Sequence, residues 1–237
     1  MIDRSKVHPP TPDVISGKAE LDAFLAAAKT LSPLPQGPGA GRLAFALDAT
    51  FSRQPTWDTA CAVQGEMFSV AADLGGLEVQ LIYYRGLNEC RASKWVAEPA
   101  RLGTLMGKIS CQGGQTQISR VLTHLQGEAE RSGLKAAVFV GDAVEEDVDA
   151  LCAKAGQLGL LGLRLFVFQD GHDRRVESAF KELARLTGGA WCRFEPGAGD
   201  ELRQLLRAVA AYAAGGRAAL TASRERGAVK LLAAMGS

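Results

Sequence analysis

The sequence predicts an α/β fold: a doubly wound, mostly parallel sheet with helices on both faces, as in Rossmann-like domains. From residue 42 onward, short apolar runs of strand length alternate with longer amphipathic stretches of helix length. This alternation is typical of parallel strands joined by crossover helices. The 237 residues are 47% hydrophobic and 22% charged, which is ordinary for a globular protein and excludes a wholly disordered chain.

The expected elements follow one another in a regular order. Apolar runs predict buried strands over residues 43–47 (ending at Asp48), 77–84, 136–140, 163–168 and 190–194. A shorter run with two charged side chains predicts an antiparallel edge strand over residues 89–96. Apolar residues at helical spacing predict helices over residues 57–73, 116–129, 148–158, 176–184 and 202–209, and a weaker helix near 99–109.

Three regions are expected along the chain. Residues 1–41 combine a proline-rich arm, a short helix and a linker dense in proline and glycine. Residues 42–214 form the α/β domain. Residues 215–237 form a helix-prone tail with four basic side chains and one acid, for which a solvated helix is the simplest explanation.

Charge and cysteine content narrow the class of protein. The net charge of +1 provides no overall basic field for nucleic acid or an anionic membrane. The five cysteines form no CxxC pair, which indicates thiols in a reducing compartment. The N-terminus has charges and prolines where a signal peptide needs an apolar core, and the longest apolar stretch is broken by Arg164. A cytoplasmic protein is therefore expected.

Oxygen-bearing side chains are predicted to meet where the winding of the sheet reverses. In the strand order 3-2-1-4-5-6, the first and fourth strands are neighbours, and ligands bind beyond their carboxyl ends. Here those strands end at Asp48 and Asp142. Thr50 and Ser52 follow Asp48 directly, and Thr116 opens the helix that leads into the fourth strand. We therefore expect these five side chains at one edge, although either aspartate alone is equally explained as a cap or turn residue.

This set of donors favours a hard cation. Two carboxylates and three hydroxyls suit Mg²⁺, which prefers oxygen ligands and keeps some of its waters. Zinc is disfavoured because no histidine or cysteine belongs to the set. The sequence thus predicts a magnesium or manganese site with a position left for an external oxygen.

The same residues carry a family resemblance. Asp48-Ala-Thr50-Phe-Ser52, then Thr116 after a glycine-rich loop, then Asp142 after an apolar strand, resembles the von Willebrand factor A (VWA) domain over residues 42–214. That family's metal-ion-dependent adhesion site (MIDAS) reads D-x-S-x-S, then T, then D. The resemblance implies that Asp48, Thr50 and Ser52 are first-loop ligands, Thr116 the second-loop ligand and Asp142 the third. It also implies that a Glu or Asp of a protein partner completes the coordination of the metal.

Two positions depart from the family pattern. Thr50 replaces the first serine, which keeps the hydroxyl and adds a methyl group. Gly141-Asp142-Ala143 replaces the common Thr-Asp-Gly. Neither change removes an oxygen donor, so the metal site is still expected.

Further polar residues are expected near this edge. Tyr84 and Arg85 end the second strand, and Asp170 and His172 follow the fifth, so these four are candidates for a partner-binding rim. An ordinary polar turn is the simpler explanation of Asp170 and His172. A run of acids after Asp142 is expected to favour the N-terminus of the next helix; it comprises Glu145, Glu146, Asp147 and Asp149.

These observations favour a metal-dependent protein-binding module over an enzyme. The alternative is a metal-dependent, phosphatase-like hydrolase that uses Asp48, as haloacid dehalogenase-like enzymes do with D-x-D-x-T. Thr50 stands where those enzymes have their second aspartate, and a threonine cannot transfer protons near neutral pH. A GxSxG nucleophile elbow and a GxGxxG dinucleotide loop are also absent from the sequence.

Overall fold

The computed structural model describes residues 41–53, 57, 77–96, 98–194, 204, 208, 209 and 213. The N-terminal arm and the C-terminal tail lie outside these residues. So do most of the helices predicted over residues 57–73 and 202–209, although Trp57, Ala208 and Val209 are described as helical and buried.

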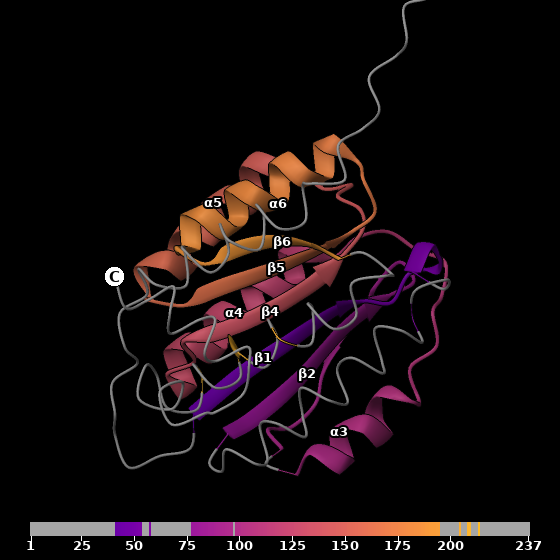
Figure 1. Ribbon diagram of the computed structural model, residues 1–237, viewed down its shortest axis with the longest axis vertical. Coiled ribbons are helices and arrows are strands. Elements are labelled where there is room, and N and C mark those ends of the chain that lie inside the picture. Colours follow the sequence, from indigo (N-terminus) through magenta and orange to yellow (C-terminus); the bar gives the residue numbers. More distant parts are fainter. Residues whose placement is uncertain are drawn as a thin grey trace, which may run out of the picture.

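Within the described residues, six strands form one sheet in the order β3-β2-β1-β4-β5-β6 (Figure 1). The parallel strands are β1 (Gly41–Asp48), β2 (Leu77–Arg85), β4 (Ala136–Gly141), β5 (Arg164–Asp170) and β6 (Ala190–Phe194). The edge strand β3 (Glu89–Ala92) runs antiparallel to β2. The fold class and the strand order predicted from the sequence are confirmed.

Helices flank the sheet: α3 (Pro99–Met106), α4 (Ile118–Ser132), α5 (Val148–Leu160) and α6 (Arg174–Thr187). Figure 1 shows α5 and α6 side by side next to β5 and β6, with α3 nearer to β2. Ala44 and Ala46 of β1 belong to the core cluster that also contains residues of α4, α5 and α6. The alternating residues Leu43, Phe45 and Leu47 are equally buried. Burial of both faces explains why β1 is a continuous apolar run.

Two element boundaries differ from the predictions. The edge strand ends at Ala92, because the Ser93 hydroxyl accepts from the Leu81 amide (3.0 Å) in place of a backbone carbonyl. Val96 then returns to form an isolated antiparallel bridge with Val79. The helix expected to open at Thr116 begins at Ile118, with Gln117 at its N-cap.

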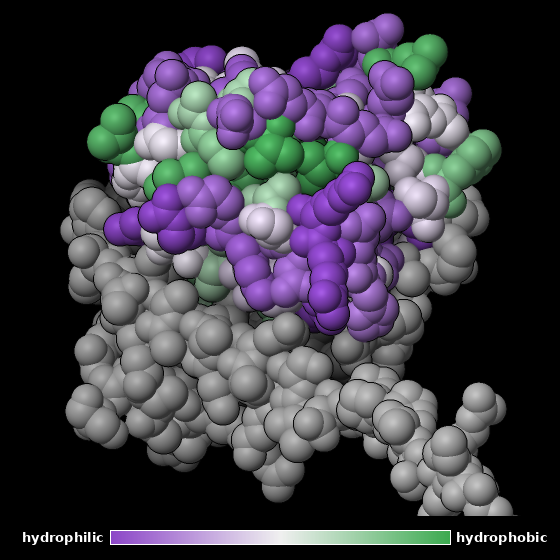
Figure 2. Space-filling model, turned by 90° about the horizontal axis from the view of Figure 1, so that it is seen from above, coloured by the Kyte–Doolittle hydropathy of each residue, from purple (hydrophilic) through white to green (hydrophobic). Residues whose placement is uncertain are grey.

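The described face that is seen from above is mostly hydrophilic (Figure 2). Figure 2, seen from above, shows hydrophilic side chains surrounding a limited apolar patch on the side where α5 and α6 lie. No helix in the described ranges is both long enough and apolar enough to cross a membrane.

Candidate functional site

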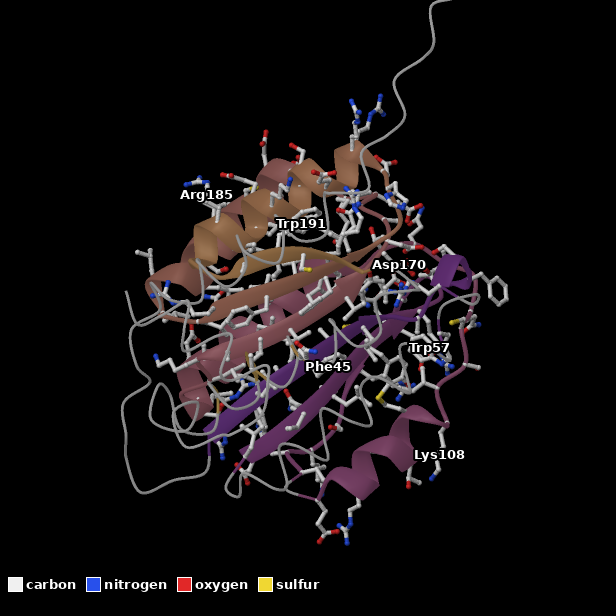
Figure 3. The ribbon with its side chains drawn as sticks, in the orientation of Figure 1. Phe45, Trp57, Lys108, Asp170, Arg185 and Trp191 are labelled. Atoms are coloured by element: carbon white, nitrogen blue, oxygen red, sulfur yellow. The ribbon has the colours of Figure 1, made fainter. Side chains whose placement is uncertain are left out.

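The two aspartates predicted to meet do lie at the same edge of the sheet. Leu47 of β1 pairs with Val140 of β4, so Asp48, the last residue of β1, and Asp142, which directly follows β4, lie at neighbouring strand ends. Figure 3 labels Asp170 at this edge, near the end of β5. The carboxyl ends of β1, β4 and β5 therefore bring their polar loops together, as expected for a doubly wound sheet.

Asp48 is a fully buried carboxylate held by two donors. Its Oδ1 accepts a hydrogen bond from the Thr50 amide (2.8 Å), and its Oδ2 accepts one from the Tyr84 hydroxyl (2.8 Å). Burial raises the pKa of Asp48 to about 6, against the lowering effect of the bonds from Thr50 and Tyr84. The negative charge of Asp142 raises this pKa further. The environment thus opposes the charged form of Asp48.

Asp142 has an oxygen atom without a hydrogen-bond partner among the described residues. The side chain is half-buried, but its Oδ1 is buried and accepts no hydrogen bond from that part of the chain. A buried acceptor without a donor costs free energy and requires an explanation, of which a bound ion is one.

The three predicted hydroxyls lie on loops connected to these aspartates. Thr50 Oγ1 and Ser52 Oγ are hydrogen-bonded to each other at 2.9 Å. Thr116 Oγ1 accepts from the Glu145 amide (3.0 Å), and the Thr116 amide donates to the Glu145 carboxylate (2.8 Å). This reciprocal pair ties Thr116 to the loop that follows Asp142. Because a hydroxyl oxygen has two acceptor lone pairs, each of these bonds leaves capacity for a cation.

The acidic run after Asp142 serves two helices, where the sequence predicted one. Asp147 caps α5 by accepting from the Asp149 amide (3.1 Å). Glu146 instead reaches α4, where its carboxylate accepts from the amides of Ile118 (2.6 Å) and Ser119 (2.8 Å). The start of α4 is therefore stabilised by a distant carboxylate, which explains why Thr116 is not its cap.

The four predicted rim residues do not all reach the surface. Tyr84 is fully buried and donates to Asp48, so its side chain cannot line a partner-facing rim. Asp170 is also buried and forms an ion pair with Arg53 of the short turn η1 (Phe51–Arg53). The predicted rim role of both residues is therefore wrong. Their polar atoms bind buried partners, so both residues support the edge from beneath it.

The other two rim residues are more accessible. Arg85 is half-buried, pairs with Glu89 (3.0 Å) and donates to the Ser110 carbonyl (2.9 Å). His172 is exposed, and its Nδ1 lies 3.1 Å from the Arg193 guanidinium. Asp173, next to it, caps α6 by accepting from the Arg175 amide (2.7 Å).

Arg53 is a supporting residue that the sequence did not reveal. Its guanidinium is fully buried and bonded to Asp170, although the residue directly follows the metal loop predicted at 48–52. An arginine in a polar loop is normally a surface residue, so no signal in the chain distinguished it.

The donor set remains one of two carboxylates and three hydroxyls. In the part of the chain that the structure describes, no three His, Cys, Asp or Glu side chains are grouped to hold a metal ion. An all-carboxylate or zinc-type centre is therefore not formed by these residues. The residues at the edge fit a hard cation through oxygen atoms of mixed charge, above all through the unpartnered Oδ1 of Asp142.

No protein family model matches the chain, and no curated protein matches it. Solved structures do match. The VWA domain of SpRpn10 is similar with a TM-score of 0.56 and 11% identity, over 72% of this chain and 93% of that one. An aerotolerance-related membrane protein from Bacteroides fragilis gives a TM-score of 0.54 and 16% identity, over 71% of this chain and 99% of that one.

A third similar structure is proximal thread matrix protein 1 from the mussel byssus, described with a zinc-occupied MIDAS motif. Its TM-score is 0.55 at 14% identity, over 73% of this chain and 46% of that one. At such low identities the likeness concerns the fold alone. The fold of this chain is that of a VWA domain.

Proposed function

We propose that the chain is a protein-binding module that holds an acidic side chain of a partner through a divalent metal ion. The ion is magnesium or manganese, bound by Asp48, Thr50, Ser52, Thr116 and Asp142 in a MIDAS-type site. The observation that carries this proposal is the buried Oδ1 of Asp142, which has no hydrogen-bond partner within the described ranges and lies close to the buried carboxylate of Asp48. Two neighbouring carboxylates disfavour each other's charge, and a cation between them relieves that cost.

The donor set also explains why a partner would be needed. Two carboxylates and three hydroxyls leave at least one position of an octahedral ion for water or an external oxygen. A Glu or Asp of a partner supplies both an oxygen and a negative charge there. The mussel byssus protein has the same fold and a zinc-occupied MIDAS motif, so a metal site occurs on this fold in that protein.

In this proposal the chain catalyses no reaction and has a scaffold or assembly role in the cytoplasm. Thr50 lacks the proton-transfer chemistry that a phosphatase of this layout needs. We expect no hydrolysis of generic phosphate or ester substrates above the level of an Asp48→Ala variant. The free thiols of Cys90 and Cys152 are consistent with a reducing compartment.

Metal binding is tested first, by calorimetry and thermal melting of the full chain. At tenfold excess over its dissociation constant, magnesium should add about 1.4 kcal/mol to the free energy of unfolding. For a chain of this size that is a rise in melting temperature of roughly 3–6 °C. Asp48→Ala and Asp142→Asn should abolish the rise, whereas the exposed Asp149→Ala should retain it. The site assignment is wrong if magnesium, manganese and calcium all leave melting and calorimetry unchanged.

The role of the metal in partner binding is tested second. Proteins retained by the immobilised chain in magnesium, and released by chelator, are identified by mass spectrometry and then titrated in purified form. Removing one member of a desolvated charge pair costs about 2–5 kcal/mol. Asp142→Ala or chelation should therefore weaken a true partner at least about thirtyfold. A partner that binds equally well in chelator and magnesium uses another surface.

A further inference from the structure

Exposed apolar side chains gather at the edge of the sheet that carries the proposed metal site. Among the described residues, four large apolar side chains are exposed: Phe51 (62%), Leu87 (69%), Val148 (38%) and Leu160 (90%). Phe51 follows β1, Leu87 follows β2, and Val148 begins α5 after the β4 loop. Leu160 ends α5 at the opposite end of that helix. Single exposed apolar residues are ordinary, but three at one edge of the sheet indicate a contact surface.

A glycine loop lies between Phe51 and the turn that carries Leu87. A Cβ atom at Gly113 would lie 3.2 Å from Cδ2 of Phe51, so the aromatic ring rests against this backbone. A Cβ atom at Gly114 would lie 2.0 Å from the carbonyl oxygen of Gly86, a contact that only glycine permits. Gly86 directly precedes Leu87 in the β2–β3 turn. Thr116 follows this loop, so the surface is contiguous with the metal-ligand loops.

A hollow of about 470 Å³ lies beside this surface, lined by residues 86–88 of the β2–β3 turn, residues 89–91 of β3 and Gln112. Its volume is within the range of pockets that accept small ligands, about 300–1,000 Å³. It is therefore large enough to receive one or two side chains of a partner.

Three arginines lie around this hollow, together with Glu89. Arg91 is 70% exposed on its side chain and pairs with Glu89 at 3.0 Å. Arg85 pairs with the same carboxylate, and its hydrogen bonds are the main reason that the pKa of Glu89 falls to about 2. Arg120 reaches the turn through the carbonyl (2.9 Å) and side-chain oxygen (3.0 Å) of Asn88. Two guanidinium groups thus pair with the Glu89 carboxylate and a third is held by Asn88, so the arginines outnumber this acid and an acidic partner segment complements them.

We infer that the partner of this module presents an acidic segment with an apolar side chain next to the carboxylate that binds the metal. The apolar side chain packs against Phe51 and Leu87, and a further acid of the segment faces Arg91 and Arg120. The inference rests on the proposed function for the metal-binding carboxylate and adds the chemistry that selects one acidic partner among many. In protein interfaces, aromatic and apolar side chains at the centre usually provide most of the affinity, and charged side chains at the rim set the orientation of the partner.

The test uses a phage-displayed library of random twelve-residue peptides, selected on the full chain in magnesium chloride. Enriched peptides should be net acidic and should carry Leu, Ile, Phe, Tyr or Trp within about two positions of an Asp or Glu. Synthetic copies are then titrated by fluorescence anisotropy against variants. Phe51→Ser and Leu87→Ser should each weaken binding about tenfold or more. Leu160→Ser, which removes an even more exposed apolar side chain at the opposite end of α5, should leave it unchanged.

Charge is tested with a second pair of variants. Arg91→Glu should weaken binding at least about threefold at low salt, and less at high salt, because exposed charges are screened. Arg101→Glu, which reverses a similarly exposed arginine on α3, should have no effect. Enriched peptides that are basic, that lack an apolar residue near the acid, or that ignore Leu87→Ser would overturn the inference. Failure to enrich any peptide in magnesium would overturn it too.

Metal binding is measured separately from peptide binding, through the magnesium-dependent rise in melting temperature. Leu87 lies outside the ligand set, so Leu87→Ser should keep the full magnesium-dependent rise in melting temperature. If that rise is present and the peptides still ignore Phe51 and Leu87, the partner inference fails while the metal site stands. If the rise is absent in the wild type, the proposed function itself fails.

Discussion

The bond between Asp48 and Tyr84 shows how a single residue pair prepares the edge for a cation. Burial raises the pKa of Tyr84 well above its ordinary value, and the charge of Asp48 adds to this effect. The phenol therefore stays protonated and remains a donor to Oδ2 of Asp48. This donor and the Thr50 amide hold the carboxylate in a fixed orientation, but they do not compensate fully for its burial.

Asp48 should make the metal-free protein less stable as the pH rises. Its pKa is raised from 3.8 to about 6 on folding, so the folded state keeps a proton that the unfolded chain has released. Protonated Asp48 therefore adds to the free energy of unfolding. This contribution is complete below about pH 4 and is lost as the pH rises through about 6. The loss is on the order of 3 kcal/mol, at about 1.4 kcal/mol per pKa unit.

Urea unfolding in chelator between pH 4.5 and 7.5 measures this effect, with Asp48→Asn as the matched variant that cannot ionise. Burial lowers the pKa of His124, which makes stability rise with pH over part of the same interval. The difference between wild type and Asp48→Asn cancels that contribution. A difference that does not change with pH would show that Asp48 is ionised without penalty.

At the scale of the element, the N-terminus of α4 depends on a loop from elsewhere in the chain. The side chain of Gln117 at the N-cap donates to the Arg85 and Gly86 carbonyls and makes no capping hydrogen bond. Glu146 supplies a charged acceptor to two amides of the first turn. The negative charge also complements the helix dipole. Because Glu145 binds Thr116 in the same loop, the start of α4 and the position of Thr116 are set together.

Glu146→Ala should lower the free energy of unfolding by about 1–2 kcal/mol, the usual loss when a helix cap is removed. Glu146→Gln should lose less, because it keeps one oxygen acceptor. Hydrogen exchange should speed up at the amides of Ile118 and Ser119, which locates the effect. Glu130→Ala, on the exposed side of the same helix, should stay within about 0.5 kcal/mol of wild type. Equal losses at Glu130 and Glu146 would exclude the capping role.

At the scale of the whole molecule, one buried ion pair connects loops that are separated by a strand. Arg53 lies on η1 after β1, and Asp170 ends β5, with β4 between the two strands. The pair therefore anchors the loop that carries Thr50 and Ser52 to the far side of the edge. Breaking a buried pair leaves a charge without its partner, whereas replacing both members by apolar groups is often tolerated.

Asp170→Ala should destabilise the protein by about 3–5 kcal/mol because the buried Arg53 guanidinium loses this carboxylate. Asp170→Asn should cost less, and the double variant Arg53→Met with Asp170→Leu should recover much of the stability. Chemical unfolding measures all three. Glu98→Ala, which breaks the exposed pair with Arg101, should change stability by less than about 1 kcal/mol. A loss for Asp170→Ala as small as this would mean that the pair contributes little.

The architecture was predictable because its signals are local. Strand and helix periodicity are properties of neighbouring residues, and the doubly wound order then places Asp48 beside Asp142 at the end of adjacent strands. Most of the helix over residues 57–73 and the two terminal regions lie outside the described residues and remain predictions. The metal ion and the protein partner also remain predictions, because they are molecules other than this chain.

The sequence by itself determined the strand order and the polar loops that share one edge, since apolar patterning and the handedness of crossovers leave few alternatives. Only the tertiary structure decided which polar atoms at that edge have hydrogen-bond or ion-pair partners, and which partners these are. Tyr84 is turned inward to Asp48, Arg53 is buried against Asp170, and Glu146 caps a helix that begins far from it in sequence. Such pairings depend on three-dimensional distance between long, rotatable side chains, and burial then strengthens each one by removing water.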